Sequence, residues 1–561
     1  MTVVIDQAKV RTYSGRPATA RPPAHRSWVT FAALAVVAAA VLGGLIIRLW
    51  WVFHQSSSAD EDIVGVVAQA GLHGHFQAFL GGQPYGGTAE PYLIALAFVV
   101  FGQTAVVIEL VASALAAVAA VLVWRIVRRL EPDPRLAWLA AALAWCGPAV
   151  TLHDSMTEYG FRGVALVCGL SVVLFSLRTF DRGPRMADLA ALGLLGGIGW
   201  WSTPEIGYFA VPAVVILGMA IHRSPAPRRR AWPRPVLVCI GCAIVGALPW
   251  IWANVGSGLA SLKSFTPILE PYTGRLSDFF HYVLPMEFDL IRTGDGARFF
   301  GSAEPYLYGL CLFLLGAALL LCAARGGPSL ALAAGVVALP FIYAISPFTW
   351  EWEDGRYGNY LTPLMAMVVA IAIKEAGRRL HLPPAVPVLV LAGMVVLVFG
   401  LSVFGTNRAA AWSSTHLTST WGDPDGATIG LVRQLEHHGL RTGYANYWVA
   451  YKLDFYGRGV LAITTAGDEI DRSLSIDDQV KRSAHPAWLF VPIYEAGRDA
   501  TQFSAPPLTV GPDGVTEAVF KERLQRLRIP YSTVNTALLS AVVPDRPVTP
   551  FEAGLPGSSP P

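Results

Sequence analysis

Apolar residues form long uninterrupted runs over the first four hundred positions of the chain. A helix needs about 20 mostly apolar residues to cross the hydrocarbon core of a bilayer. Segments that approach or reach this length lie at 31–53, 104–124, 136–152, 160–177, 187–202, 204–222, 235–253, 306–323, 328–346, 359–375 and 384–404. The pattern therefore predicts a polytopic α-helical membrane protein with about 11 transmembrane helices.

Two apolar runs need separate treatment. The stretch 88–101 is too short for a span and suits an interfacial or re-entrant helix. The first run, 31–53, is longer than the roughly 7–15-residue apolar core of a cleavable signal peptide, so we expect it to stay as a membrane anchor.

Basic residues orient the predicted bundle, because cytoplasmic loops carry an excess of Lys and Arg. Alternate polar segments beginning with the N-terminal one hold 21 Lys and Arg, whereas the loops between them hold six. We therefore expect a multi-pass protein of the plasma membrane with a cytoplasmic basic tail at 1–27 and a membrane domain at 28–404. An odd number of spans places the C-terminus outside the cell.

Two of the predicted external loops are long, at 52–103 and 254–305. After residue 405 the apolar runs stop, and helical patterns (427–439 and 515–528) mix with strand-like ones (459–465, 487–493 and 537–543). This mixture predicts a small extracytoplasmic α/β domain at 405–543. The Pro-, Gly- and Ser-rich end at 544–561 predicts a flexible tail.

Composition supports this prediction and excludes several classes of protein. Hydrophobic residues make up 53% of the chain and charged residues 14%, with a mean hydropathy of +0.47, whereas a soluble chain has about 25% charged residues. This composition excludes a soluble enzyme and a disordered chain. A disulfide scaffold is excluded because all six Cys lie in apolar runs. The lipid bilayer is an expected partner and nucleic acid is not. Arg48, near the outer end of the first run, is expected to extend its charge to the membrane surface.

Three acids follow the first span directly, in the sequence Ser56–Asp62, and the loop offers no Lys or Arg to neutralise them. One interpretation is structural: Ser58 and Glu61 have capping-box spacing, and acids favour the first turn of a helix. The other is that one of the three carboxylates acts as a general base for substrates that arrive from the membrane surface. Spacing alone leaves both open.

Further along the same loop, residues 81–92 combine glycines and prolines with Gln83, Tyr85 and Glu90. Gly and Pro permit tight turns, and these three side chains can hydrogen-bond a hydroxyl-rich ligand. An ordinary loop explains the glycines but not the polar and aromatic residues among them.

Two later external loops carry charge beside the apolar slab. Residues 153–162 include Asp154, Glu158 and Arg162, and residues 350–357 include Arg356 and Tyr357. Charges so close to lipid are costly unless they are paired or used. A plain polar hairpin explains the first of these loops equally well.

The order of these parts resembles the GT-C class of membrane glycosyltransferases. The likeness rests on the Asp-Glu pair after the first span, the run GQPYGGTAEPY, the second acidic loop, the number of spans and the external tail. It is strongest to the bacterial branch related to protein O-mannosyltransferases and the lipid A aminoarabinose transferase. By layout it covers residues 28–404, and Tyr444–Leu453 resembles a tyrosine-rich segment of bacterial members.

The resemblance implies sugar transfer from a polyprenyl-phosphate donor to an acceptor hydroxyl of a glycan, lipid or protein at the outer leaflet. It maps the loop carboxylate of the family onto Asp60, with Glu61 beside it, and the acid of the second loop onto Asp154 or Glu158. Some relatives hold the donor phosphate with a Lys in the first loop, which this chain lacks. Other possible phosphate ligands are Arg162, Lys263, Arg275, Arg356 and a divalent cation held by the acids. No other cofactor is expected.

Two other classes remain open. A transporter or flippase would also have many spans, although transporters usually place polar groups near the bilayer midplane, whereas here the acids cluster at one outer edge. A binding or scaffold protein would use the external tail for docking.

Overall fold

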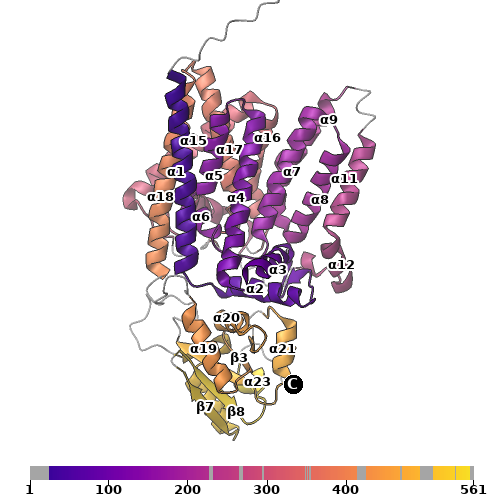
Figure 1. Ribbon diagram of the computed structural model, residues 1–561, viewed down its shortest axis with the longest axis vertical. Helices are drawn as coiled ribbons and strands as arrows, with labels where there is room; N and C mark the ends of the chain where they lie inside the picture. Colours follow the sequence, from indigo (N-terminus) through magenta and orange to yellow (C-terminus); the bar gives the residue numbers. More distant parts are fainter. Residues whose placement is uncertain are drawn as a thin grey trace, which may run out of the picture.

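The helices form an upright bundle with a small domain at one end (Figure 1). The computed structural model describes residues 25–225, 232–263, 270–293, 296–347, 349, 352, 355–413, 425–467, 471–492, 509–536 and 538–555. Most of the predicted N-terminal tail and the last six residues of the chain lie outside these ranges.

Every segment predicted to span the membrane is helical in the structure. The helices in the order of these segments are α1 (His25–His54), α4 (Ala105–Leu130), α5 (Pro134–Cys146) with α6 (Ala149–Asp154), α7 (Arg162–Arg182), α8 (Met186–Ser202), α9 (Gly207–Arg223), α11 (Pro233–Gly246) with α12 (Leu248–Ser257), α15 (Glu304–Arg325), α16 (Pro328–Tyr343), α17 (Leu361–Arg379) and α18 (Ala385–Ser413). The predicted polytopic helical membrane protein is thus confirmed in its class.

The count of eleven spans is not reached by length and composition alone. In the described part of the chain, six helices meet both criteria: α1, α4, α7, α9 with its preceding 3-10 turn, α15 and α18. The pair α11 and α12, bent by 60° at the break between them, makes a seventh if it counts as one span. The helices α5, α8 and α16 are shorter, and α17 carries four charged residues in its last six positions. The full count stays a prediction.

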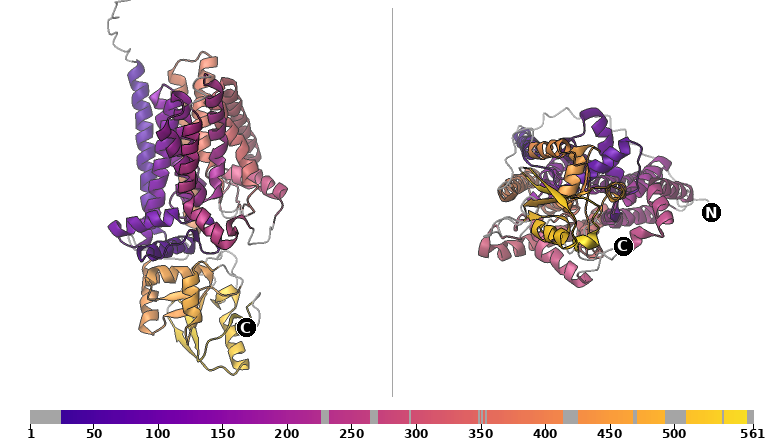
Figure 2. Two further views of the ribbon diagram at one scale, coloured as in Figure 1. Left: turned by 90° about the vertical axis from the view of Figure 1, so that its right-hand side faces the viewer. Right: turned by 90° about the horizontal axis from the view of Figure 1, so that it is seen from below.

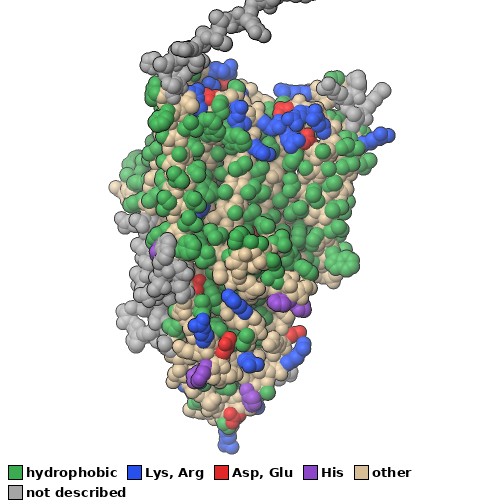
Figure 3. Space-filling view, in the orientation of Figure 1, with side chains coloured by type: hydrophobic (Ala, Val, Ile, Leu, Met, Phe, Trp, Pro, Cys, Tyr) green, Lys and Arg blue, Asp and Glu red, His purple; other side chains and the backbone are tan. Residues whose placement is uncertain are grey.

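An apolar belt surrounds the bundle, and basic side chains gather at the end opposite the small domain (Figure 3). Large apolar side chains such as Phe31, Phe313 and Leu397 are between 61% and 75% exposed. In water such a surface would aggregate, so lipid must cover it.

The helices α8 and α11 touch through their backbones. A Cβ atom on Gly193 would lie 2.0 Å from the carbonyl oxygen of Cys239, and one on Gly197 would lie 2.2 Å from that of Ala243. Small residues let helices in a membrane approach closely, where dispersion replaces the missing hydrophobic effect. These glycines therefore set the distance between the two helices.

Two short helices lie crosswise between the bundle and the small domain (Figures 1 and 2): α2 (Ala59–Leu72) and α3 (Ala89–Phe101). A hairpin of β1 (Phe79–Leu80) and β2 (Gln83–Gly87) connects them. The placement of α3 agrees with the prediction that 88–101 does not span the membrane.

The small domain is built on a mixed sheet with the strand order β4-β3-β5-β8-β7, and β6 pairs with β5 at one end. The strands are β3 (Thr442–Tyr444), β4 (Ala462–Thr464), β5 (Ala487–Pro492), β6 (Thr509–Val510), β7 (Tyr531–Asn535) and β8 (Ser540–Pro544). The pairs of β3 with β4 and β5 are parallel, and the remaining pairs are antiparallel.

Helices cover both faces of this sheet. Leu431 and Leu435 of α19 (Gly426–His437) and Leu453 of α20 (Tyr447–Gly457) share one apolar core with the sheet. On the other face, Phe520 of α22 (Glu517–Arg526) stacks on the buried indole of Trp488. The helices α21 (Leu474–Lys481) and α23 (Pro550–Ala553) complete the domain.

The sequence therefore predicts the α/β class of this domain and the positions of α19, α22, β4, β5 and β8. It misses α20, α21, α23, β3, β6 and β7, most of which are short. The helix α23 lies within the stretch 544–561 that was expected to be a flexible tail, and Val548, Ala553 and Leu555 are buried in the core of the domain. Burial in the sheet, rather than a local pattern, defines such short strands.

The close packing of α8 on α11 predicts that Gly197→Leu destabilises the bundle. The new side chain would collide with the backbone of α11, and overpacking of this kind costs about 1–3 kcal/mol or more. We expect a lower melting temperature of the purified protein in detergent. Gly241→Leu is the matched control, because a Cβ atom at that exposed position of α11 meets nothing within 4 Å; an equal loss in both variants would contradict the role of this contact.

Candidate functional site

The first turn of α2 directs three neighbouring acids toward three different surroundings. Ser58 caps the helix and forms a full capping box with Glu61. Successive helical residues point about 100° apart. Asp60, Glu61 and Asp62 consequently have different partners, and only one of the three faces a pocket.

Glu61 serves the fold of this turn. Its carboxylate accepts hydrogen bonds from the backbone N–H of Ser58 at 2.7 Å and of Glu158 at 3.2 Å. The side chain is buried, and burial raises its pKa. The structural interpretation of the capping box is thus correct for Glu61, which lines neither pocket described below.

Asp62 is fully buried and faces a lysine from the small domain. Its Oδ1 atom accepts from the hydroxyl of Ser57 at 2.8 Å, and the Nζ atom of Lys452 lies 3.9 Å from Oδ2. Lys452 also donates to Asp425 and to Ser56, at 3.0 and 2.7 Å. Burial alone would lower the pKa of Lys452, but Asp62 and Asp425 raise it, so the ammonium stays charged. This cluster ties α20 to the end of α1.

Asp60 faces a polar pocket. Its Oδ1 atom accepts a hydrogen bond from the hydroxyl of Tyr447 at 2.6 Å, and the Nη1 atom of Arg356 lies 3.7 Å from Oδ2. The side chain of Asp60 keeps 27% of its surface exposed. The pocket is lined by Asp60, Ile63, Leu80, Gln83, Tyr85, Tyr159, Phe161, Arg162, Arg356, Tyr447 and Arg472. One carboxylate thus meets three guanidinium groups in one place.

Arg162, at the start of α7, lines the same pocket and packs against aromatic rings. Its guanidinium lies 4.6 Å from the ring centre of Tyr357, and its Nε atom lies 3.4 Å from Glu205. The hydroxyl of Tyr360 donates to the same carboxylate at 2.7 Å. Stacking on aromatic rings suits Arg better than Lys, and it fixes the direction of the charge.

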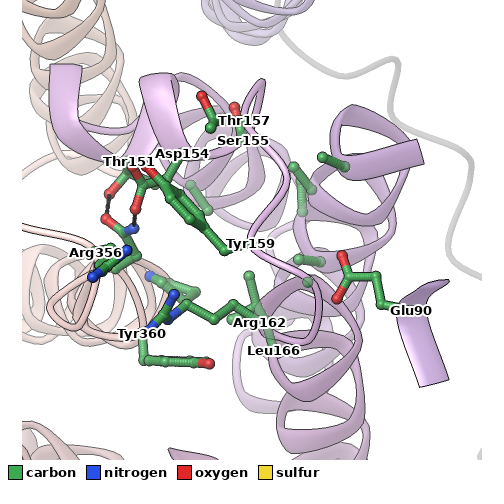
Figure 4. A pocket seen from close by; sticks show the side chains of 18 of the residues that line it. Glu90, Thr151, Asp154, Ser155, Thr157, Tyr159, Arg162, Leu166, Arg356 and Tyr360 are labelled. Carbon is green, nitrogen blue, oxygen red and sulfur yellow. Dashed lines mark hydrogen bonds between the residues drawn. The ribbon is translucent and has the colours of Figure 1, made fainter. Parts of the chain in front are cut away.

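A second cavity begins beside these arginines and continues between the helices (Figure 4). It holds about 780 Å³ of space between atoms, open solvent at its mouth included. Figure 4 shows Arg162, Arg356 and Tyr360 gathered on one side, with Glu90 across from them. Much of the remaining wall consists of small alanines: Ala112, Ala116, Ala119, Ala120 and Ala144.

Arg162, Arg356 and Tyr159 line both cavities. The first cavity is polar and contains Asp60, and the second is mainly apolar and is lined largely by small side chains. An elongated ligand with an anionic group between a polar head and an apolar tail matches this order of surroundings.

Asp154 lies in the second cavity rather than beside Asp60. It is hydrogen-bonded to the side-chain amide of Asn359, and the Nδ1 atom of His153 lies 3.4 Å from its Oδ1 atom. Figure 4 shows it on the same side of the cavity as Arg356.

Glu158 and Glu90 form a buried carboxyl pair behind Arg162. The Oε1 atom of Glu158 accepts from the backbone of Gly160 at 2.6 Å, and Glu90 accepts from Val164 at 3.0 Å. Burial raises the pKa of both groups, and the charge of Glu90 raises that of Glu158 further. Glu90 lines the second cavity, and Glu158 lines neither.

Two of the cations named from the sequence lie elsewhere. Lys263 is exposed and lines neither cavity. Arg275 is buried and donates to the carbonyl of Ala344 at 3.0 Å, so it holds α13 (Tyr272–Asp278) against the end of α16. Arg48 is also not directed to the membrane surface: it is 2% exposed, donates to the carbonyl of Trp145 at 2.9 Å and lines the second cavity.

Sequence reasoning missed Tyr159, Tyr447 and Arg472 as pocket residues. Tyr447 lies within the tyrosine-rich segment that carries part of the family likeness, which was its one signal. Arg472 follows that segment by some twenty positions and reaches the pocket because the tip of the β1-β2 hairpin contacts its backbone. A Cβ atom on Gly81 would lie 1.9 Å from the carbonyl oxygen of Arg472.

Within the part of the chain that the structure describes, no group of three or more His, Cys, Asp or Glu side chains is arranged to hold a metal ion. The acids of the α2 turn are already paired with a lysine, a tyrosine and backbone N–H groups.

Comparisons with known proteins agree with this architecture. Residues 88–252, less than a third of the chain, match the family model described as dolichyl-phosphate-mannose-protein mannosyltransferase. The comparison with curated protein sequences gave no match.

Among solved structures, ArnT from Cupriavidus metallidurans in the apo state matches with a TM-score of 0.56 at 12% identity. The match covers 96% of this chain and 100% of ArnT. The same protein bound to undecaprenyl phosphate gives a TM-score of 0.55 at 13% identity with the same coverage. The family match over residues 88–252 and the shared fold bear out the resemblance found in the sequence, which is to the GT-C class of membrane glycosyltransferases.

Proposed function

We propose that the protein moves a sugar from a polyprenyl-phosphate donor to an acceptor hydroxyl at the extracytoplasmic face of the plasma membrane, with Asp60 as the general base. One observation carries the proposal: Asp60 shares its pocket with two arginines that also line an apolar cavity inside the bundle. In this order, Asp60 would face the acceptor, the arginines the sugar phosphate, and the apolar wall the lipid tail.

The donor is argued from the second cavity. An isoprenoid chain is apolar and slender, and the alanines of α4 leave room for it between the helices. ArnT, whose fold this chain shares, has been solved with undecaprenyl phosphate bound. We assign the phosphate to Arg162 and Arg356, because Lys263 and Arg275 lie outside both cavities.

The chemistry requires a base and a cation on opposite sides of the anomeric carbon. Asp60 removes the proton of the acceptor hydroxyl as its oxygen attacks the anomeric carbon. The bond from this carbon to the phosphate oxygen breaks, and the electron pair leaves with the lipid phosphate, where the arginines stabilise the new charge. Attack opposite the phosphate inverts the anomeric centre.

The orientation follows from charge. Basic side chains collect at the end of the bundle that lies away from the small domain (Figure 3), and this excess marks the cytoplasmic side. The N-terminus is then cytoplasmic and the small domain extracytoplasmic. The helices α5, α8, α16 and α17 complete a bundle of about 11 spans.

If Asp60 is the base, Asp60→Asn removes transfer while the protein still folds and inserts. The loss should be about 10²–10⁴-fold in kcat, the usual contribution of a positioned base. Release of polyprenyl phosphate and formation of product by purified protein, followed by mass spectrometry with a panel of polyprenyl-phosphate sugars, measure the effect. Asp478→Asn, a change at an exposed acid of the small domain that pairs with Arg482, is the matched control. Near wild-type turnover by Asp60→Asn would remove this residue from the role of base.

The phosphate assignment predicts different results at two cations. Arg356→Gln should lower kcat/KM for the donor by about 10–10²-fold, because a charge-assisted contact in a site of low dielectric is lost. Lys263→Gln should leave kcat/KM near the wild-type value. The reverse order of effects would transfer the phosphate site to the loop after α12.

The tail cavity predicts sensitivity to bulk at the alanine positions. Ala116→Phe would fill the space between α4 and α7, and we expect a higher KM for a donor of full isoprenoid length than for a short-chain analogue. Ala114→Phe on the exposed face of the same helix is the control. An equal change for both donor lengths would contradict binding of the tail in this cavity.

A further inference from the structure

The helix α20 of the small domain lies along α2, the helix that carries Asp60. Phe455 packs onto Gly65, where a Cβ atom would come within 2.4 Å of the ring. The side-chain amide of Gln69 donates to the carbonyl of Phe455 at 3.2 Å, and the hydroxyls of Tyr456 and Ser57 lie 3.3 Å apart. Together with the cluster of Lys452 and Asp62, these contacts fix α20 on α2 along most of its length.

Tyr447, the first residue of α20, makes a contact of a different kind. Its hydroxyl donates to Oδ1 of Asp60 at 2.6 Å and accepts a hydrogen bond from Nε of Arg472 at 3.2 Å. Nη1 of Arg472 in turn donates to the carbonyl of Gly81 at 3.2 Å. This chain joins the small domain, the β1-β2 hairpin and Asp60, although Tyr447 and Asp60 are 387 positions apart in sequence.

We propose that the small domain completes the reaction centre by supplying Tyr447 as a positioning residue for Asp60. The inference rests on the proposed function, in which Asp60 is the base. By holding Oδ1, the tyrosine fixes the rotation of the carboxylate and keeps Oδ2, which lies 3.7 Å from Nη1 of Arg356, as the oxygen that takes the proton of the acceptor hydroxyl. Tyr447 keeps its own proton throughout the reaction.

Two features distinguish this contact from a simple tether. The docking of α20 is already secured by Lys452, Phe455 and Tyr456, so the hydroxyl of Tyr447 is not needed to hold the helix. The terminal torsion of an aspartate is otherwise broad, and a base loses efficiency when its reactive oxygen is not held in hydrogen-bond reach. Tyr447 also remains a donor, since burial and then the charge of Asp60 raise its pKa.

The charged and titratable groups around Asp60 come from four parts of the chain. They are Arg356 from the loop before α17, Arg162 and Tyr159 from the second loop, Tyr85 from β2, and Tyr447 and Arg472 from the small domain. Three arginines and the hydroxyl of Tyr447 therefore surround this carboxylate. Removing the hydroxyl takes away the hydrogen bond that holds Oδ1 and leaves the arginines in place.

The test is Tyr447→Phe in the full-length protein, assayed with the polyprenyl-phosphate sugar that the wild-type protein uses. We expect kcat to fall about tenfold and KM for the donor to stay within about twofold, because the carboxylate loses its positioning contact while the donor site is unchanged. Arg472→Gln, which leaves the hydroxyl in place but loosens it, should give a smaller change of the same kind. Tyr531→Phe, the same change on β7 of the small domain, should behave as wild type.

Each contrary result has a distinct meaning. A raised KM for the donor, or an equal fall of kcat in Tyr531→Phe, would make Tyr447 a merely structural residue and overturn the inference. So would wild-type kinetics in Tyr447→Phe. Full activity of Asp60→Asn, or no product from any polyprenyl-phosphate sugar with wild-type protein, would instead overturn the proposed function.

Discussion

Burial of charge at the junction of α1, α2 and α20 is the constraint on which the rest of the molecule depends. Asp62 is fully buried at the end of the first span, and an unpaired charge there would cost several kcal/mol. The ammonium of Lys452 and the hydroxyl of Ser57 face this side chain, and burial raises the pKa of its carboxyl. Because the lysine belongs to the small domain, this cluster of buried groups joins that domain to α2. The geometry around Asp60 follows from this docking.

The sequence specified the membrane domain well because the physical signal is local. Each apolar run becomes a helix, since a backbone in lipid must satisfy its own hydrogen bonds. The capping box of Ser58 and Glu61 was likewise readable from four residues. Local patterns did not predict which side chains contact each other. Glu61 accepts a hydrogen bond from the backbone of Glu158 in the second loop. Tyr447 and Arg472, which reach Asp60, come from the small domain near the end of the chain. Such contacts depend on tertiary structure, over hundreds of positions in sequence.

The arginines illustrate the same limit. In the sequence, Arg162, Arg275 and Arg356 look equivalent, because each is a cation in a loop close to an apolar run. Their environments differ. Arg275 donates hydrogen bonds to backbone carbonyls. Arg162 lies over the ring of Tyr357, and Arg356 lies over the ring of Tyr159, at the border of the two cavities. Aromatic neighbours on both sides of a cation were visible in the sequence, but their convergence required the folded loops.

The crosswise helix α3 has one more consequence. Leu96, Val99, Val100 and Phe101 are between 67% and 74% exposed on its outer side, so this helix floats at the boundary of the hydrocarbon and the headgroups. The β1-β2 hairpin joins α3 to α2 and so holds Asp60 near this boundary. In the proposed reaction the phosphate of a carrier lipid lies at the same level, and the lipid reacts without leaving the leaflet in which it diffuses.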